Sequence, residues 1–170
     1  MLNLLRCCII AIAFMANAGE TWGCSHTLPL APSEVEAIAT WSAQRMGLQT
    51  RKALPCLRTA SALELTDYRY KNSTPETAAI NLVAIYDPKD NVILVIQDQN
   101  INSTSGLSVV VHEMVHYLQF QSGERFLCIE QMEEQALTIQ EAFLVERGTS
   151  LKREFGIDPF SRLVAGLCQR

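Results

Sequence analysis

The stretch LSVVVHEMVHYLQF, from Leu107 to Phe120, decides how this chain folds. Wound at 3.6 residues per turn, it is apolar almost all the way round, which is typical of a central, buried helix. One polar stripe interrupts it, and Glu113 lies at the flank of that stripe. Because buried polar groups need partners, we expect the stripe to have partners inside the protein. Its members are Ser108, His112, His116 and Gln119.

Residues 112–116 form an H-E-x-x-H motif. A spacing of four places the imidazoles of His112 and His116 one turn apart on the same helix face, so both can bind one ion. Zinc suits neutral imidazole nitrogens, and a catalytic zinc has three protein ligands and a water. Glu113 lies beside the ion, where it would accept a proton from that water, whose pKa the metal lowers to about 7. The motif therefore predicts Zn²⁺, with His112 and His116 as ligands and Glu113 as the general base.

The third ligand is expected to be a carboxylate from the next helix. The chain has three histidines; no histidine follows His116, and the remaining one, His26, lies in an irregular lead-in near the N-terminus. On a helical wheel Glu133 falls inside the apolar arc of the following helix, where an acidic side chain needs a partner. Glu133 is therefore the first choice and Glu134 the second. Glu130 and Glu141 are expected to lie on a solvated helix face.

The first 18 residues have the features of a secretory signal peptide. Arg6 gives a positive start, residues 7–15 are an unbroken apolar run, and residues 16–18 form a small-x-small cleavage site. The run is shorter than the roughly 20 residues of a membrane-spanning helix. We expect cleavage after Ala18 and a single domain over residues 19–170, periplasmic or secreted and without membrane attachment after cleavage.

Export changes the interpretation of the cysteines. Four of the six remain after cleavage, and none of them forms a C-x-x-C pair. A cysteine zinc site or a thioredoxin-like redox pair is therefore not expected. Two structural disulfides are predicted, and the sequence leaves their pairing open. The cysteines concerned are Cys24, Cys56, Cys128 and Cys168.

The remaining pattern predicts an α+β fold. A capping box at Ser33–Glu36 starts a helix that ends near Gly47, and residues 55–70 mix a short strand with a helical turn. Branched apolar residues at 80–86 and 92–97, separated by turn residues, predict an antiparallel hairpin. Residues 100–106 are expected to be a loop, residues 126–147 a second long helix, and Asp158-Pro159 the start of a last short helix. The buried stripe of the second long helix should comprise Ile129, Met132, Ala136, Ile139 and Phe143.

Charge argues against several classes of function. The chain has 14 Lys and Arg residues against 18 Asp and Glu, a net charge of −4, and no basic patch for a phosphate backbone. It has no P-loop and no G-x-G-x-x-G after a strand. Nucleic-acid and nucleotide binding are therefore not expected, and the expected partner is a peptide or protein substrate.

These residues resemble the gluzincins, the metallopeptidase superfamily typified by thermolysin, in which a glutamate on a later helix joins H-E-x-x-H. The segment Glu133-Glu134-Gln135-Ala136 is similar to the start of their third-ligand helix, and Leu137 stands where many of them have Asp. The chain also resembles small exported bacterial domains with a minimal zincin-like fold, over residues 80–148. That resemblance rests on Cys128, Glu133, Ala136, Gln140 and Phe143-Leu144. It implies a small antiparallel sheet packed on a central H-E-x-x-H helix and a second long helix, with Val92–Gln97 as the edge strand that holds a peptide.

Three functions follow in order of preference. The first is an exported zinc metallopeptidase that hydrolyses peptide bonds by a metal-activated water. The second is a metal-binding domain without hydrolysis, serving as an interaction or regulatory module, although zinc binding alone does not need Glu113. The third is a disulfide-bonded domain without a metal. A peptidase also needs a donor for the developing oxyanion, and no choice is made among Tyr68, Tyr70, Tyr86 and Tyr117.

Overall fold

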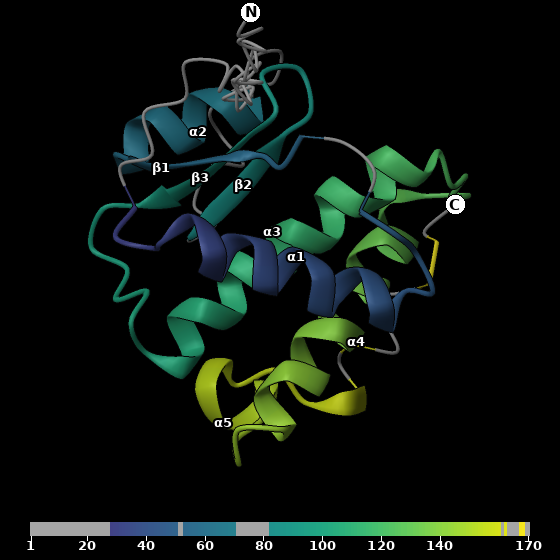
Figure 1. Cartoon of the computed structure of the whole chain (residues 1–170). Helices are drawn as coiled ribbons and strands as arrows, with labels where there is room; N and C mark the ends of the chain where they lie inside the picture. Colours follow the sequence, from purple (N-terminus) through teal and green to yellow (C-terminus); the bar gives the residue numbers. More distant parts are fainter. Residues whose placement is uncertain (1–27, 51–52, 71–81, 161, 163–166, 169–170) are drawn as a thin grey trace, which may run out of the picture.

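The predicted α+β class is confirmed by a computed structural model, which describes residues 28–50, 53–70, 82–160, 162, 167 and 168 (Figure 1). The predicted signal peptide, Cys24 and His26 lie outside the described residues. In chain order the elements are α1 Pro32–Arg45, β1 Cys56–Ala60, α2 Ala62–Tyr70, β2 Ala84–Asp87, β3 Val92–Ile96, α3 Thr104–Ser122, α4 Ile129–Val145 and α5 Leu151–Phe155.

The sheet is mixed, so the prediction of a small antiparallel sheet is correct for β2 and β3 and wrong for β1. The predicted hairpin is present: β2 and β3 pair antiparallel, with Ala84 opposite Val95 and Asp87 opposite Val92. On its other side β3 pairs in parallel with β1, which gives the strand order β1-β3-β2. The chain crosses over through α2 between β1 and the hairpin, and such a crossover allows parallel pairing.

The central place of β3 also corrects the expected substrate strand. Val92–Gln97 is predicted to be an edge strand, but β3 has a partner strand on both sides. Its residues Ile93 and Val95 are completely buried, which fits a central strand. The edge strand that contacts α3 is β2. The predicted first strand began at Ile80; β2 begins at Ala84, and residues 71–81 lie outside the described part.

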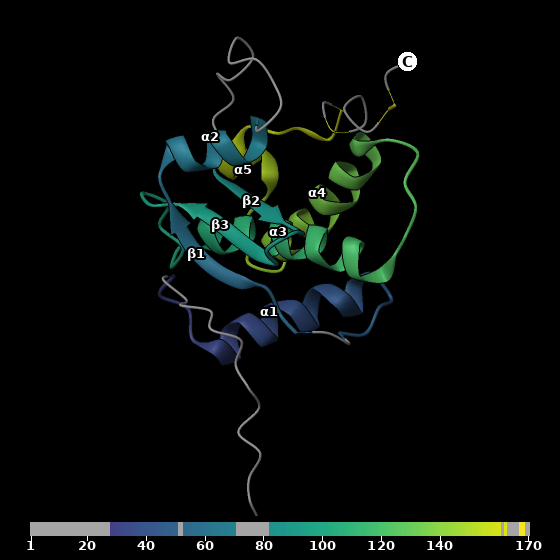
Figure 2. The ribbon, with the colours of Figure 1, turned by 90° about the horizontal axis from the view of Figure 1, so that it is seen from above.

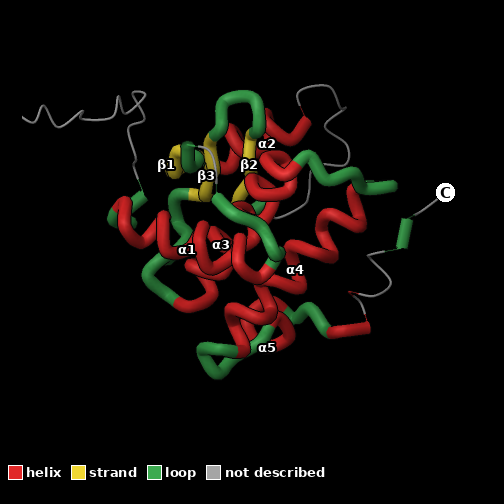
Figure 3. The backbone as a smooth tube through the Cα atoms, turned by 45° about the vertical axis from the view of Figure 1, so that its right-hand side comes forward, coloured by secondary structure: helices red, strands yellow, loops and turns green. Residues whose placement is uncertain are grey.

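Helices cover both faces of the sheet, with α2 on one face and α1 and α3 on the other (Figures 1 and 2). Leu65 of α2 packs with Leu94 on the first face, whereas Val110 and Met114 of α3 belong to the core on the second face. In Figure 3, α3 lies between α1 and α4, and α5 lies at the end of α4. Valines 110, 111 and 115 and Met114 have no exposed surface, so the predicted central, buried helix is confirmed.

Three helix starts differ from the sequence predictions. Helix α1 begins at Pro32, not at Ser33, because proline is favoured at the first helical position and Glu34 accepts a hydrogen bond from the Ala31 N–H at 2.7 Å. Helix α2 begins with a capping box that was not predicted: Glu64 accepts from the Ser61 N–H at 2.7 Å, and the Ser61 hydroxyl accepts from the Glu64 N–H at 3.2 Å.

Helix α3 begins within the segment expected to be a loop. The Ser103 hydroxyl accepts from the Gly106 N–H at 3.0 Å, which caps the helix and makes Thr104 its first residue. Gly106 therefore lies in the first helical turn. There it is buried against the Asn100 carbonyl, where a Cβ atom would come within 2.0 Å of the oxygen. Gly123 ends the helix with a left-handed φ of 69°.

One disulfide joins the C-terminal segment to α4. Cys128, the residue that precedes α4, bonds to Cys168, and Cys56 is also in a disulfide. Helix α5 is not predicted by the sequence pattern, whereas Pro159, Phe160 and Arg162 are helical, as expected for a last short helix. Among the described helices, none is both long and apolar enough to cross a membrane.

Candidate metal centre

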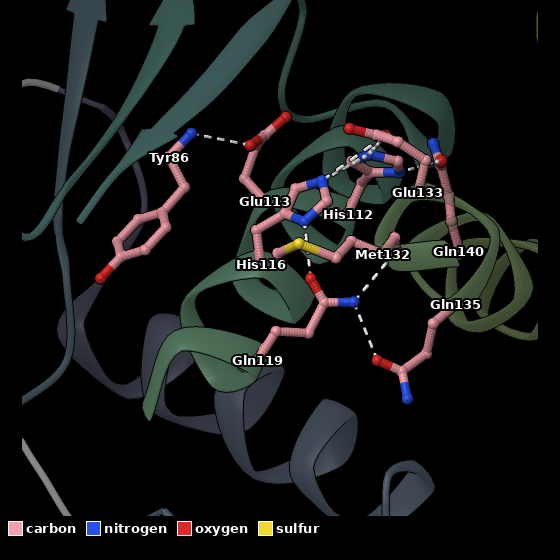
Figure 4. Close-up of polar contacts among 9 residues, drawn as sticks. All are labelled: Tyr86, His112, Glu113, His116, Gln119, Met132, Glu133, Gln135 and Gln140. Atoms are coloured by element: carbon pink, nitrogen blue, oxygen red, sulfur yellow. Dashed lines mark hydrogen bonds and ion pairs between the residues drawn. The ribbon is translucent and has the colours of Figure 1, made fainter. Parts of the chain in front are cut away.

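Helices α3 and α4 bring three predicted ligands together (Figure 4). The Nε2 atoms of His112 and His116 are 3.2 Å apart, and Oε2 of Glu133 lies 3.3 Å from the first and 3.6 Å from the second. The histidine side chains are 15% and 13% exposed and that of Glu133 is 39% exposed. The group is thus enclosed by protein on most sides and open to solvent at the carboxylate.

The spacing of these three atoms fits a tetrahedral zinc. Zn–N and Zn–O bonds of roughly 2.0–2.2 Å give a tetrahedron whose edges are about 3.3–3.6 Å long. The three observed separations are 3.2, 3.3 and 3.6 Å, so one ion can lie at bonding distance from all three atoms. The donor set, two imidazoles and a carboxylate, is also one that zinc uses in catalytic sites.

The other candidate carboxylates have different partners. Glu134 points away from the histidines and pairs with Arg162 at 2.9 Å. Glu141 accepts a hydrogen bond from the Leu151 N–H at 2.6 Å, at the start of α5. Glu130 lies beside Cys128 and Cys168, whose sulfurs are joined to each other and are therefore not free to bind a metal. Glu133 is the one of the four that lies at the histidine pair.

The polar stripe of α3 finds its partners on α4 and within α3. Nδ1 of His112 lies 3.0 Å from Oε1 of Gln140, and Nδ1 of His116 lies 2.8 Å from Oε1 of Gln119. Both glutamines are almost fully buried, at 5% and 1% exposure. Each ring is therefore held at Nδ1 by an amide, and its Nε2 faces Glu133. The amides occupy the positions that carboxylates or carbonyls usually take behind metal-binding histidines.

Charge and burial act in opposite directions on the group. Burial disfavours the ionised form of Glu133, but the hydrogen bonds and the charge that the His112 and His116 rings supply when protonated at Nε2 outweigh it, so the pKa of this carboxyl lies far below its usual range. Burial likewise disfavours a charged His116, but its hydrogen bond with Glu133 and the charges of Glu113 and Glu133 raise its pKa above the ordinary value. Without a metal, the two side chains thus favour an imidazolium–carboxylate pair, and a cation could replace the proton.

Glu113 connects the helix to the edge of the sheet. Its side chain is buried, at 7% exposure, and Oε2 accepts a hydrogen bond from the backbone N–H of Tyr86 on β2 at 2.8 Å. In Figure 4 the carboxylate lies beside the His116 ring, on the side away from α4. Glu113 is not among the three grouped ligand atoms, as expected for a base that acts next to a metal and does not bind it.

The tyrosine hydroxyls with described partners point elsewhere. The Tyr86 hydroxyl donates to Asn91 Oδ1 at 3.1 Å, away from the histidines, and the Tyr117 hydroxyl donates to the Ala53 carbonyl at 3.2 Å. Burial raises the pKa of both hydroxyls. Tyr68 packs with the core on the α2 face of the sheet, and the side chain of Tyr70 lies outside the described residues. Tyr86, Tyr117 and Tyr68 therefore supply no oxyanion donor in this arrangement.

An apolar hollow lies next to the group, between the end of α3 and the start of α4. It is open to solvent and has a volume of about 390 Å³, and Gln119 and Met132, which flank His116 and Glu133, form part of its wall. Phe120 and Ile129, also in the wall, are 53% and 55% exposed. Ile129 is predicted to belong to the buried stripe of α4, but it is exposed. The reason is that it is the first residue of the helix, which begins outside the core.

The comparisons with known proteins give a family. No curated protein and no solved structure matches the chain. The profile described as "Domain of unknown function (DUF6647)" matches residues 29–156 of the 170, a range that contains the elements from α1 to α5 and every residue of the candidate site. The chain therefore belongs to the family of domains of unknown function DUF6647.

Proposed function

We propose that this domain is an exported zinc metallopeptidase with a minimal zincin-like fold of the gluzincin type. The observation that carries the proposal is the triangle formed by His112 Nε2, His116 Nε2 and Glu133 Oε2, whose sides of 3.2–3.6 Å fit the edges of a zinc tetrahedron. The H-E-x-x-H spacing and the buried carboxylate of Glu113 support the same conclusion.

Each residue of the group has a distinct role in this proposal. His112, His116 and Glu133 would hold the ion. When bound, zinc supplies a Lewis acid that polarises a peptide carbonyl and lowers the pKa of water to near 7. Glu113 accepts the proton of the attacking water and returns it to the leaving amine. The Tyr86 N–H, which binds one oxygen of Glu113, holds the base in place and leaves the other oxygen to act.

Strand β2 is the proposed place of the substrate. It is the sheet edge next to α3, and its Tyr86 backbone reaches Glu113 directly. A peptide added in extended form along this edge would pass the metal group, and main-chain hydrogen bonds would orient it. Export to the periplasm or the exterior is part of the proposal, on the basis of the charged start and apolar run of residues 1–18.

A metal-binding domain without hydrolysis is the second candidate. The observation in its favour is that the hydroxyls of Tyr86 and Tyr117 are bonded elsewhere, so neither is placed to stabilise an oxyanion. Bound zinc without hydrolysis of a broad peptide panel would support this second candidate.

Two adjacent glutamates allow a matched test. The wild type is expected to bind one zinc and to hydrolyse casein or peptides. Glu113→Gln should keep the zinc and lose about 10²–10⁴-fold in turnover, because the amide still accepts the Tyr86 N–H but is no base. Glu133→Gln should lose most of its zinc, whereas Glu134→Gln, whose side chain pairs with Arg162, should keep it. Metal content by mass spectrometry and hydrolysis rates are measured on all four proteins.

Two results would count against these assignments. Full zinc occupancy of Glu133→Gln would exclude it as a ligand. Undiminished hydrolysis by Glu113→Gln would exclude it as the base.

A further inference from the structure

Two buried glutamines, one from each helix, bridge α3 and α4 on either side of the candidate ligands. Gln140 of α4 contacts His112 and Ser108, both on α3. Gln119 of α3 contacts His116 on its own helix and Met132 and Gln135 on α4. We call Gln119 and Gln140 the bridging glutamines (Figure 4).

The hydrogen bonds around Gln140 have one consistent direction. The Ser108 hydroxyl donates to the Ser105 carbonyl at 2.7 Å, so its oxygen is left to accept from Nε2 of Gln140 at 3.1 Å. This fixes the amide with Oε1 towards His112, and an amide oxygen only accepts. Nδ1 of His112 must then carry a proton, and in the neutral ring Nε2 therefore holds the lone pair.

The same argument applies to Gln119. Its Nε2 donates to the Met132 carbonyl at 2.9 Å and to Gln135 Oε1 at 2.8 Å, and a backbone carbonyl can only accept. Oε1 of Gln119 therefore faces Nδ1 of His116, which must carry the proton. In the neutral rings, both Nε2 lone pairs then point towards Glu133.

We propose that Gln119 and Gln140 are positioning residues that hold both imidazoles in the Nδ1-protonated tautomer before a metal binds. The ring orientation and tautomer that zinc needs are thus set by the fold and not by the ion. This inference rests on the proposed metal centre for its purpose, but the tautomers belong to the metal-free protein and can be measured there.

The two bridging glutamines should differ in their tolerance of a carboxylate. In Gln140→Glu, the new carboxylate still accepts from His112, and the Ser108 hydroxyl can rotate to donate to it. In Gln119→Glu, a carboxylate oxygen would face the Met132 carbonyl, which lies 2.9 Å from Nε2 in the wild type and cannot turn. Two acceptors then oppose each other, so the bridge to the turn that carries Glu133 is lost.

The first measurement uses metal-free wild-type protein. Long-range ¹H–¹⁵N spectra of the imidazoles, recorded at a pH where the rings are neutral, distinguish the two tautomers. His112 and His116 should both give the Nδ1–H pattern. An Nε2–H pattern for either ring would overturn the proposal, whether or not the protein binds zinc.

The second measurement compares zinc affinities by competition with a chelator. Gln119→Leu, Gln140→Leu and Gln119→Glu should bind zinc roughly 10–100-fold more weakly than wild type, the usual effect of losing an outer partner of a ligand. Gln140→Glu should bind no more weakly than wild type. Gln131→Glu is the matched control, because Gln131 lies on α4 but uses its Oε1 to accept from the Leu127 N–H.

Each outcome decides a separate point. Equal affinities of Gln119→Glu and Gln140→Glu would overturn the asymmetry and with it the assigned hydrogen-bond directions. Far-ultraviolet circular dichroism of the metal-free variants shows whether each is folded, and the wild-type tautomers decide the proposal if a variant is not. Failure of wild type to bind zinc would refute the proposed function, whereas the tautomer spectra would still test this inference.

Discussion

Replacing Gly106 with alanine should destabilise the protein, although glycine is normally a weak residue within a helix. By propensity alone, this change in the first turn of α3 would stabilise by about 1 kcal/mol. The structure predicts the opposite sign. An added Cβ would lie 2.0 Å from the Asn100 oxygen and 2.7 Å from the Ile101 Cα, whereas such contacts are essentially never shorter than 3.0 Å. The loop or the helix would have to move by about 1 Å, the difference between 3.0 and 2.0 Å.

The expected size follows from what that movement disturbs. Crowding of this kind in a packed region costs about 1–3 kcal/mol. The Ser103 cap, whose hydroxyl also donates to the Asn100 carbonyl at 2.6 Å, contributes about 1 kcal/mol. After subtracting the propensity gain of about 1 kcal/mol, the net loss in the free energy of unfolding is about 1–3 kcal/mol.

Urea denaturation of the oxidised protein measures this loss directly. Thr104→Ala, in the same turn, is the matched control and should stay within about 0.5 kcal/mol of wild type. A Gly106→Ala protein that is more stable than wild type would show that α3 does not approach the Asn100 carbonyl this closely. The placement of the helix that carries H-E-x-x-H would then be wrong.

Three further predictions test the core and the metal group. Leu144→Ala should lower the free energy of unfolding by about 2–5 kcal/mol, because the Leu144 side chain is fully buried. Val145→Ala should stay within about 0.5 kcal/mol of wild type, because Val145 is 58% exposed. Equal losses for the two variants in urea denaturation would contradict this prediction. In metal-free protein, the low pKa of Glu133 adds stability that is fully present above pH 4.5 and is lost as the pH falls. The raised pKa of His116 adds stability that is fully present below pH 6.5 and is lost as the pH rises. Their joint contribution is therefore complete between pH 4.5 and 6.5, and Glu133→Gln should flatten the pH profile of unfolding; an unchanged profile would refute the pairing. Free zinc at 100 times its dissociation constant should stabilise the domain by about 2.7 kcal/mol, which corresponds to a rise in Tm of roughly 5–10 °C. A chelator should reverse this rise. A Tm that does not change on addition of zinc would contradict the metal centre.

The parts of the fold that the sequence predicted depend on local spacing. Helix α3 and the position of its two histidines follow from the 3.6-residue period, and the β2–β3 hairpin follows from turn residues between two apolar runs. The place of Glu133 was predicted from the need of an acidic residue in an apolar arc for a partner. These inferences use residues that are close in the chain, or the chemistry of a single side chain.

The parts that were missed depend on contacts between distant residues. The parallel pairing of β1 with β3 joins Cys56 to Val92, and no local pattern specifies it. The role of Gln140 depends on Ser108 and His112, 32 and 28 residues earlier in the chain. Gln119 was identified as part of a polar stripe, but its bond to the Met132 carbonyl required the packing of α4 to be known.

The contacts between α3 and α4 determine which parts of the chain can be substituted without disturbing the candidate ligands. Residue numbers rise along one helix as they fall along the other, from Ser108 with Gln140 to Gln119 with Met132, so the pair is an antiparallel hairpin. All three candidate ligands and both bridging glutamines lie on it, within residues 108–140, and the described part of the sheet contributes the Tyr86 N–H that binds Glu113. If the domain is a metallopeptidase, as proposed, ion binding and peptide contact thus fall to separate stretches of chain. In that case, substitutions in β2 that keep the Tyr86 N–H would alter which peptides are accepted while leaving the ion's surroundings untouched.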